Sequence, residues 1–436
     1  MMIRTDIAIA ARNLARHTRR NVLLGSAIAG VTAMLVLLGG LTTGMREAML
    51  QSATTLMTGH VNLAGFFKIT SGTAAPIVAG WERPWDAVKA LVPELTYAAP
   101  RGRGWAKAVA DGVSMDLILA GVELDREPRF RDVIQVVDGN LDELRKPGTI
   151  LIFQDQAKRL GVKPGDTITL SAPTTRGASN TADVRIGAVA RNIGLLSAFN
   201  AFLPAETLRQ LYQLKAGTTG AVQIYLRDAD DSAKVAARLR AALREAGYRV
   251  MDPDPQPYWQ KLMFKVNAED WTGQKLDVTT WEDEMSFLSW IVTAVTWLGN
   301  VLVTVLMVIV AVGIVNTLAI AIRERTREIG TLRAIGMQRS QVLRLTLLEA
   351  FLLGLAGALL GALVGAAGAG ALNAAGIELP ETMQYFLLQR NLHLAIHTGQ
   401  VAVYVAFVTG LTTAAAIWPS AYAARLRPVT AMHHIG

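Results

Sequence analysis

The segment IRERTREIGTLRAIG, residues 322–336, decides the fold expected of this chain. It is densely charged, and long uncharged apolar runs lie on both sides of it. A segment with so many charges does not cross a bilayer, so we expect it to lie at a membrane surface between two spans.

An apolar stripe runs through this charged segment. Ile329, Leu332 and Ile335 recur at helical spacing, which is typical of a helix pressed into a groove on another protein. Gly330 and Gly336 allow close approach or a turn. The alternative interpretation is a solvated surface loop.

Four segments are long and apolar enough to span a membrane. The boundaries predicted from these runs are a cytoplasmic amphipathic helix 1–20, spans 21–44, 286–322, 350–375 and 400–418, an external α/β domain 45–285, a cytoplasmic coupling region 323–349, an external loop 376–399 and a cytoplasmic end 419–436. A cleaved signal peptide is an alternative for the first run. Its apolar core is too long for that, and Leu41-Thr42-Thr43-Gly44 is a poor cleavage site.

Arginines predict the orientation. They precede the first span, fill the loop between spans two and three, and follow the fourth span, whereas the loop between spans three and four holds only Arg390. Short loops rich in arginine stay in the cytoplasm. Both termini and the charged loop are therefore expected in the cytoplasm, and residues 45–285 outside it.

The external segment is expected to be a mixed α/β domain. Strands are predicted at Thr149–Phe153, Ala221–Leu226 and Tyr248–Met251, and a hairpin at Thr167–Leu170 with Asp183–Val189. Helices are predicted at Gln154–Leu160 and Ser232–Glu245, with a turn at residues 163–166. The unit formed by residues 221–251 is interpreted as a small subdomain inserted in the first.

The second span is longer than a bilayer needs, so its surplus is expected to project as a stalk, with residues 45–57 as a helical partner. Tilt, or a break near Gly299, is the alternative. Gly354, Gly357, Gly361, Gly365 and Gly368 predict close helix packing in span three. Tryptophans 281, 290, 297 and 418 are interpreted as interfacial.

Composition narrows the function classes. The net charge of +8 resides largely in arginines beside apolar runs, which favours membrane orientation over nucleic-acid binding. The absence of cysteine excludes disulfides. No Gly-x-x-x-x-Gly-Lys-Ser/Thr motif occurs, and no catalytic residue is predicted. His393 and His397 are a weak metal pair, and no metal site is predicted.

Three stretches resemble the FtsX/MacB-type ABC transporter permeases. They are RERTREIGTLRAIGMQRSQV with the apolar run after it, GTILIFQDQAKRLGVKPGDTITL in the external segment, and the closing stretch Trp418–Met432. The opening AARNLAR at residues 10–16 resembles the N-terminal elbow helix of this family. The resemblance implies a four-helix membrane protein whose periplasmic domain has a porter part and a smaller Sabre part.

The resemblance also implies the partners. In the family the charged segment docks on a cytoplasmic ATPase dimer, which binds ATP and Mg²⁺, and this chain itself holds no cofactor. A second permease chain, a periplasmic carrier or adaptor, and membrane lipid are the other partners implied, in an inner membrane. The residues expected to couple to the ATPase are Arg323, Glu324, Arg325, Glu328, Ile329, Gly330, Leu332, Arg333, Gly336 and Arg339.

The leading function is extraction of lipoproteins by mechanotransmission, as in the permeases LolC and LolE. The alternatives are a MacB-type efflux permease with an adaptor, and an FtsX-like activator of a cell-wall hydrolase. Acyl chains are expected to enter beside Leu37, Leu41, Leu288, Ile291 and Val295, unless these residues simply face lipid or each other. Thr174, Thr175 and Arg176 form a candidate carrier or partner loop, shorter than the hook of LolC.

Overall fold

The computed structural model describes residues 9–10, 12–13, 18–70, 72–324, 331 and 336–425. The chain divides into two units. The helical unit contains residues 1–47, 293–378 and 391–436, and the mixed unit contains residues 48–292 and 379–390.

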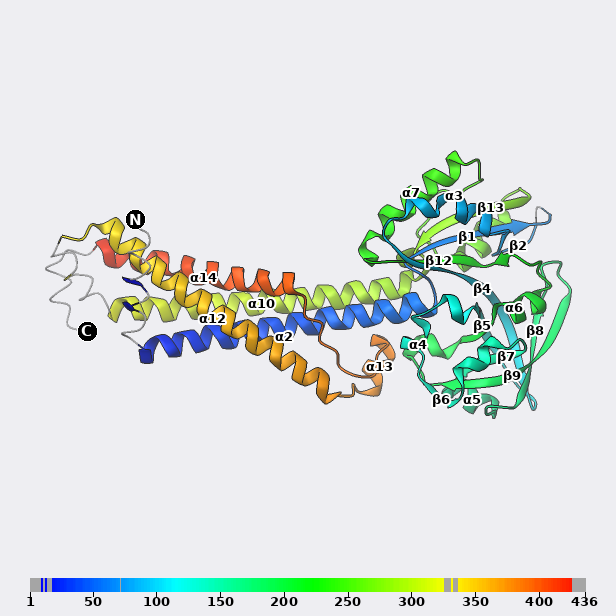
Figure 1. Cartoon of the computed structure of the whole chain (residues 1–436), viewed down its shortest axis with the longest axis horizontal. Coiled ribbons are helices and arrows are strands. Elements are labelled where there is room, and N and C mark those ends of the chain that lie inside the picture. Colours follow the sequence, from blue (N-terminus) through cyan, green and yellow to red (C-terminus); the bar gives the residue numbers. More distant parts are fainter. Residues whose placement is uncertain are drawn as a thin grey trace. The chain divides into compact units, whose positions relative to one another are not determined.

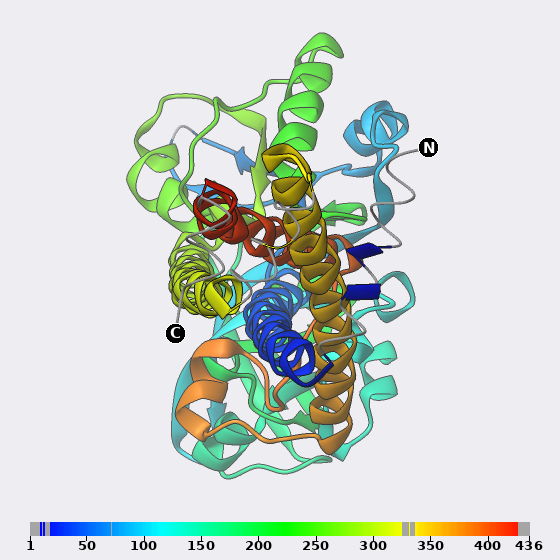
Figure 2. The same cartoon turned by 90° about the vertical axis from the view of Figure 1, so that its left-hand side faces the viewer.

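Four long helices make up most of the helical unit in the part of the chain that the structure describes (Figures 1 and 2). They are α2 (Thr18–Leu56), α10 (Ser286–Glu324), α12 (Arg339–Ala375) and α14 (Thr398–Arg425). Among the described residues, these are the helices long and apolar enough to cross a membrane. The four predicted spans are therefore confirmed, and each helix extends beyond its predicted range.

Glycines on α12 allow it to lie directly against α2. A Cβ atom at Gly361 would lie 2.3 Å from the Ala29 carbonyl oxygen, and one at Gly365 would lie 2.9 Å from the Ala33 carbonyl oxygen. At Gly354 the close neighbour is Thr412 of α14. The predicted role of these glycines in helix packing is confirmed, because any side chain there would push the backbones apart.

Helix α10 runs without a break from Ser286 to Glu324, so the alternative of a break near Gly299 is wrong. Gly299 instead lies against α2, where a Cβ atom would come within 2.3 Å of Thr42 Cγ2. Helix α2 also continues past the predicted end of the first span, so that the helix expected at residues 45–57 is present to Leu56.

The mixed unit combines short helices with one large sheet (Figure 1). Its strands are β1 (Val61–Lys68), β2 (Ala74–Ala75), β3 (Val78–Ala79), β4 (Leu95–Ala110), β5 (Val113–Val122), β6 (Val136–Gly139), β7 (Thr149–Phe153), β8 (Thr167–Pro173), β9 (Ser179–Ala190), β10 (Asn200–Pro204), β11 (Thr218–Thr219), β12 (Ala221–Leu226) and β13 (Gly273–Thr280). Its helices are α3 (Glu82–Val88), α4 (Phe130–Val133), α5 (Gln154–Leu160), α6 (Ala205–Tyr212), α7 (Ser232–Glu245), α8 (Tyr258–Phe264), α9 (Trp281–Glu284) and α13 (Glu381–Leu387). Short 3₁₀ turns are η1 (Lys89–Leu91), η2 (Leu124–Arg126), η3 (Leu141–Arg145), η4 (Gly194–Ala198), η5 (Ala229–Asp231) and η6 (Val266–Ala268).

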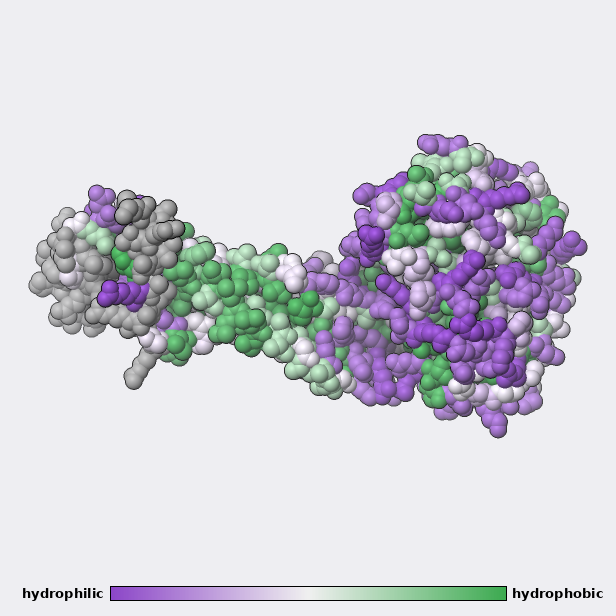
Figure 3. All heavy atoms as spheres, in the orientation of Figure 1, coloured by the Kyte–Doolittle hydropathy of each residue, from purple (hydrophilic) through white to green (hydrophobic). Residues whose placement is uncertain are grey.

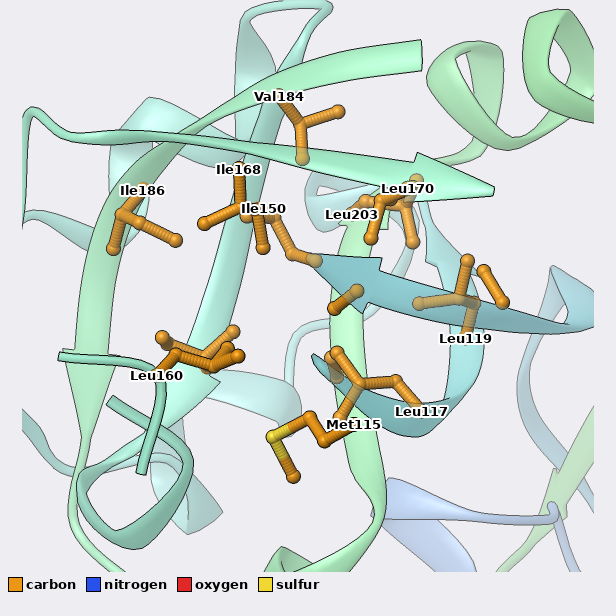
Figure 4. Close-up of a cluster of buried hydrophobic side chains, with 14 of the residues drawn as sticks. Met115, Leu117, Leu119, Ile150, Leu160, Ile168, Leu170, Val184, Ile186 and Leu203 are labelled. Carbon is orange, nitrogen blue, oxygen red and sulfur yellow. The ribbon is translucent and has the colours of Figure 1, made fainter. Parts of the chain in front are cut away.

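The sheet order is β13-β1-β12-β4-β5-β10-β7-β9-β6, with β2 and β8 pairing beside this path. Long strand β4 joins two hydrophobic cores: Ala98 packs against the core under α3 and α7, and Ala106 belongs to the core under α5 and α6. Figure 4 shows side chains of the second core, including Leu117, Ile150 and Leu170.

The nesting of the two parts corrects the sequence interpretation. Strand β12 pairs with β1, and β1 pairs with β13, so the part containing residues 221–245 is built from both ends of the domain. The part with strands β5 to β10 is the inserted one. Long-range pairing of β1 with β13 decides this nesting, and local sequence patterns do not contain that information.

Most local predictions in the mixed unit are confirmed. Strands β7 and β12 and helices α5 and α7 have the predicted bounds, and β8 and β9 form the predicted hairpin. The strand predicted at Tyr248–Met251 is wrong, since only an isolated bridge joins Val250 to Leu276. Pro253 and Pro255 follow closely and lack the N–H groups that a longer ladder needs.

The two units differ in surface character. Figure 3 shows hydrophobic residues over the helical unit and largely hydrophilic residues over the mixed unit. Trp290, Trp297 and Trp418 are exposed, as an interfacial position requires. Trp281 is buried in the mixed unit, so its interpretation as an interfacial residue is wrong.

Candidate functional site

Most of the predicted coupling segment lies outside the described residues. Arg325, Glu328, Ile329, Gly330, Leu332 and Arg333 are among these undescribed positions. Arg323 and Glu324 are the last residues of α10, and Arg339 is the first of α12. Gly336 has a φ of 109°, a conformation that favours glycine.

The C-terminal end of α2 is held by buried polar side chains of the sheet. The Arg101 guanidinium donates to the carbonyl oxygens of Leu56 at 3.1 Å and Thr55 at 3.2 Å. The Tyr225 hydroxyl donates to the carbonyl oxygen of Thr54 at 3.1 Å. The last carbonyls of a helix have no partner within it and carry negative partial charge, so a buried arginine is a favourable cap.

A buried carboxylate balances this arginine. Glu127 accepts from Arg101 Nε at 3.2 Å and forms a second hydrogen bond with Arg101 Nη2. Burial raises the pKa of Glu127, and the Arg101 charge opposes that shift. Burial alone would lower the pKa of Arg101, but the pKa is raised, because Glu127, Tyr225 and Tyr97 together outweigh burial. Removing one partner would leave the other charge buried without compensation.

A second polar cluster holds the residues just before α10. Glu284 ends α9, and its carboxylate accepts from Thr279 Oγ1 at 2.8 Å and lies 3.5 Å from Arg103 Nη2. The Arg103 guanidinium also lies over the Tyr258 ring, 4.3 Å from its centroid. Beside it, Lys261 and Asp277 form a buried ion pair at 2.9 Å.

One strand supplies both arginines. Arg101 and Arg103 are two residues apart on β4, so they point to the same face of the sheet. The opposite face needs glycine, because a Cβ at Gly102 would lie 2.3 Å from Leu208 and one at Gly104 would lie 2.6 Å from Tyr212. We call Arg101 with Glu127 and Arg103 with Glu284 the two helix joints. Sequence reasoning missed them, although the alternation RGRG at residues 101–104 was their signal.

The candidate partner loop is a tight hairpin turn between β8 and β9. The backbone carbonyl oxygen of Thr174 accepts from Gly177 N at 2.9 Å, and the backbone N–H of Thr174 donates to Ala178 O at 2.8 Å. Thr174 is buried, whereas Arg176 is exposed. All three predicted residues, Thr174, Thr175 and Arg176, line a cleft of about 510 Å³ in the mixed unit.

The side chains predicted to line an entry for acyl chains are only partly exposed. Leu37, Leu41, Ile291 and Val295 are half-buried, and the side chain of Leu288 lies outside the described part of the chain. Leu37 Cδ2 would lie 3.6 Å from a Cβ at Gly368, so it packs against α12.

His393 and His397 lie in a segment without regular secondary structure, so they do not share a helical face. His397 Nε2 lies 2.6 Å from Glu47 Oε1. No group of three or more metal-ligating side chains occurs among the residues that the structure describes.

Two ranges of the chain match models of known protein families. The family model described as FtsX-like permease C-terminal matches residues 300–428, and that of the MacB-like periplasmic core domain matches residues 23–242, which is half of the chain. The macrolide export ATP-binding/permease protein MacB of Bartonella quintana is 22% identical over 437 residues, covering 98% of this chain and 58% of that protein. The corresponding protein of Rhodopirellula baltica is 33% identical over 144 residues, covering 33% of this chain and 19% of that protein. The chain therefore spans less than two thirds of the length of these relatives.

A solved structure, the periplasmic region of MacB from Actinobacillus actinomycetemcomitans, matches at 11% identity with a TM-score of 0.30, covering 53% of this chain and 94% of that chain.

Proposed function

This chain belongs to the FtsX/MacB-type permease family, and we propose that it is the membrane subunit of an ABC transporter working by mechanotransmission. In this proposal a cytoplasmic ATPase dimer closes on ATP and Mg²⁺ and moves the coupling segment. Helices α2 and α10 carry the motion to the mixed unit, which acts on substrate in the periplasm. ATP is then the ligand that biases a two-state element.

The two helix joints are the observation that supports this proposal. One joint ties the last residues of α2 to strand β4, and the other ties α9, which directly precedes α10, to the same strand, both through charged, buried side chains. Such contacts are costly unless their geometry is maintained, so they resist slippage when a helix shifts. Because both joints are on one strand, motions of α2 and α10 converge on the same part of the sheet.

We also propose a location and a topology for the chain. It lies in the inner membrane, with both termini in the cytoplasm and the mixed unit in the periplasm. A second permease chain, identical or homologous, accompanies it. The arginine distribution and the four apolar helices support this arrangement.

The proposed coupling is tested at the second joint. Glu284→Gln keeps the size of the side chain but removes the charge that faces Arg103. In proteoliposomes that contain this chain and its partner ATPase, we expect ATP hydrolysis to continue and less substrate to be released per ATP. Asp125→Asn, in an exposed ion pair with Arg145, is the matched control. A wild-type ratio of release to hydrolysis in Glu284→Gln would contradict the proposal.

Two substrate classes fit this mechanism. Lipoprotein extraction is supported by the apolar side chains of α2 and α10 near Leu41, since each buried methylene contributes about 0.8 kcal/mol. Efflux of a small amphiphile with a periplasmic adaptor is supported by the names of the relatives, which are macrolide exporters, and by the short turn at residues 174–178. The two-part mixed unit disfavours an FtsX-like activator.

A photo-crosslinking residue at Leu41 in native membranes distinguishes these classes. Crosslinks to a lipoprotein are expected if lipoproteins are extracted. Crosslinks to lipid alone would favour efflux.

A further inference from the structure

A cleft in the mixed unit combines an apolar wall with unpaired cationic and polar groups. Its volume is about 510 Å³, within the roughly 300–1,000 Å³ typical of small-molecule sites. The segment before β2, strand β4, the turn between β8 and β9, and helices α6 and α8 contribute its lining.

The wall of the cleft is apolar and partly uncovered. Ile69, Ile77, Trp105, Leu214 and Leu262 line it. Ile69 is 55% exposed and Trp105 is 38% exposed, although both are large hydrophobic side chains. A bound apolar body would remove this surface from water, which is the main favourable term in binding.

The charge in the cleft has one sign. Arg103 and Arg176 line it, and no aspartate or glutamate is among the described residues that do so. Arg103 is engaged by Glu284. Arg176 is exposed and forms no ion pair or hydrogen bond with any residue in the described part of the chain. Its guanidinium is free to bind an anion.

Next to Arg176, a buried hydroxyl lacks a partner. Thr174 is only 6% exposed, and its Oγ1 makes no hydrogen bond within the described residues. Burial of a hydroxyl without a partner costs free energy, so such groups in native proteins require an explanation. A ligand oxygen bound at the turn would satisfy it.

We propose that this cleft binds an amphipathic organic anion, with the anionic group at Arg176 and Thr174 and the apolar body against Trp105, Ile69 and Ile77. The site lies within the mixed unit and does not depend on the proposed transport function. Tyr212 fixes the cleft wall, because its hydroxyl accepts from Trp105 N at 2.6 Å and also donates to Trp105 O.

The test uses the full chain in lipid nanodiscs and a matched pair of probes. The probes are 8-anilino-1-naphthalenesulfonate and N-phenyl-1-naphthylamine, its neutral counterpart without the sulfonate. Because the natural sequence has no cysteine, Ala75→Cys places a single thiol on the lining, and Ser114→Cys places one on an exposed strand outside it. The rate of maleimide labelling reports whether the cleft is occupied.

We expect the anionic probe to slow labelling at position 75 but not at position 114. Arg176→Gln in the Ala75→Cys background should raise the half-protecting concentration about tenfold, since a hydrogen bond to a charged group contributes about 1.5–3 kcal/mol. Thr174→Val should raise it as well, and Arg159→Gln, an exposed arginine on α5, should not.

Equal protection by the neutral probe would overturn the proposal, because it would mean that the arginine plays no part. Unchanged protection in Arg176→Gln, or equal slowing at positions 75 and 114, would also overturn it.

Discussion

At the scale of single residues, the buried charges of the mixed unit are its least predictable feature. Arg101 and Arg103 appear in the sequence as ordinary surface arginines, yet they are 1% and 9% exposed. Their partners Glu127 and Glu284 lie far along the chain and follow no motif. Burial of a charge depends on tertiary pairing, so only the glycines that alternate with the two arginines could have pointed to these sites.

His60 gives a pH dependence whose sign follows from its burial. Burial, together with the charge of Arg129, lowers the pKa of His60 from 6.5 to about 4, and the charge of Asp228 opposes the shift. Between pH 4 and pH 6.5 the unfolded chain binds more protons at His60 than the folded chain does. The contribution of neutral His60 to the free energy of unfolding is therefore complete above pH 6.5 and is lost as the pH falls toward 4. The loss amounts to about 3 kcal/mol.

His60→Asn should reduce this dependence. The Asn side-chain oxygen can still accept from Leu226 N, as His60 Nδ1 does at 3.0 Å, but it does not titrate. We expect the Tm of the full chain in nanodiscs to fall less between pH 7 and pH 4.5 in this variant than in the wild type. His393→Asn, an exposed histidine, is the control. Identical slopes for His60→Asn and the wild type would show that His60 is not responsible.

At the scale of elements, the sequence was most informative where periodicity and turn residues act locally. The bounds of β7, α5, β12 and α7 follow from such patterns, and Gly161 ends α5 with a φ of 70°. The four long helices were predicted because a membrane span requires about 20 apolar residues. Their ends were less predictable, since α2 continues beyond the apolar run through polar residues such as Arg46 and Glu47.

The packing of α12 on α2 predicts a contrast between two glycines of the same helix. Gly361→Ala puts a methyl group 2.3 Å from the Ala29 carbonyl oxygen, whereas Gly370→Ala meets nothing within 4 Å. We expect the first variant to lose about 1–3 kcal/mol, through overpacking, and to show a lower Tm in nanodiscs. The second should match or exceed the wild type, because alanine is the better helix former. A Tm equally unaffected in both variants would argue against close packing at Gly361.

At the scale of the whole molecule, the division into a helical and a mixed unit was predictable, but the internal order of the mixed unit was not. Charge and hydropathy separate residues 45–285 from the spans. Pairing of Val61 with Thr280 joins the two ends of that segment, and no local pattern specifies such a contact. The candidate cleft also depends on this assembly, because it includes residues from β4, the turn at residues 174–178 and α8.

The charged segment leads to the last prediction, which concerns the proposed link between ATP hydrolysis and the mixed unit. Glu328 lies in the sequence one helical turn from Glu324, on the flank of the apolar stripe of Ile329, Leu332 and Ile335. If this segment docks in a groove of the ATPase, Glu328→Lys reverses a charge at the contact and should weaken or uncouple it. We expect the variant to insert in the membrane while releasing less substrate per ATP, or failing to copurify with the ATPase. Glu245→Lys, at an exposed position of the mixed unit, is the matched charge reversal and should leave both measurements unchanged. Full copurification together with full activity of Glu328→Lys would exclude this part of the segment from the contact, because a charge reversal within a docked interface costs binding free energy that both assays detect.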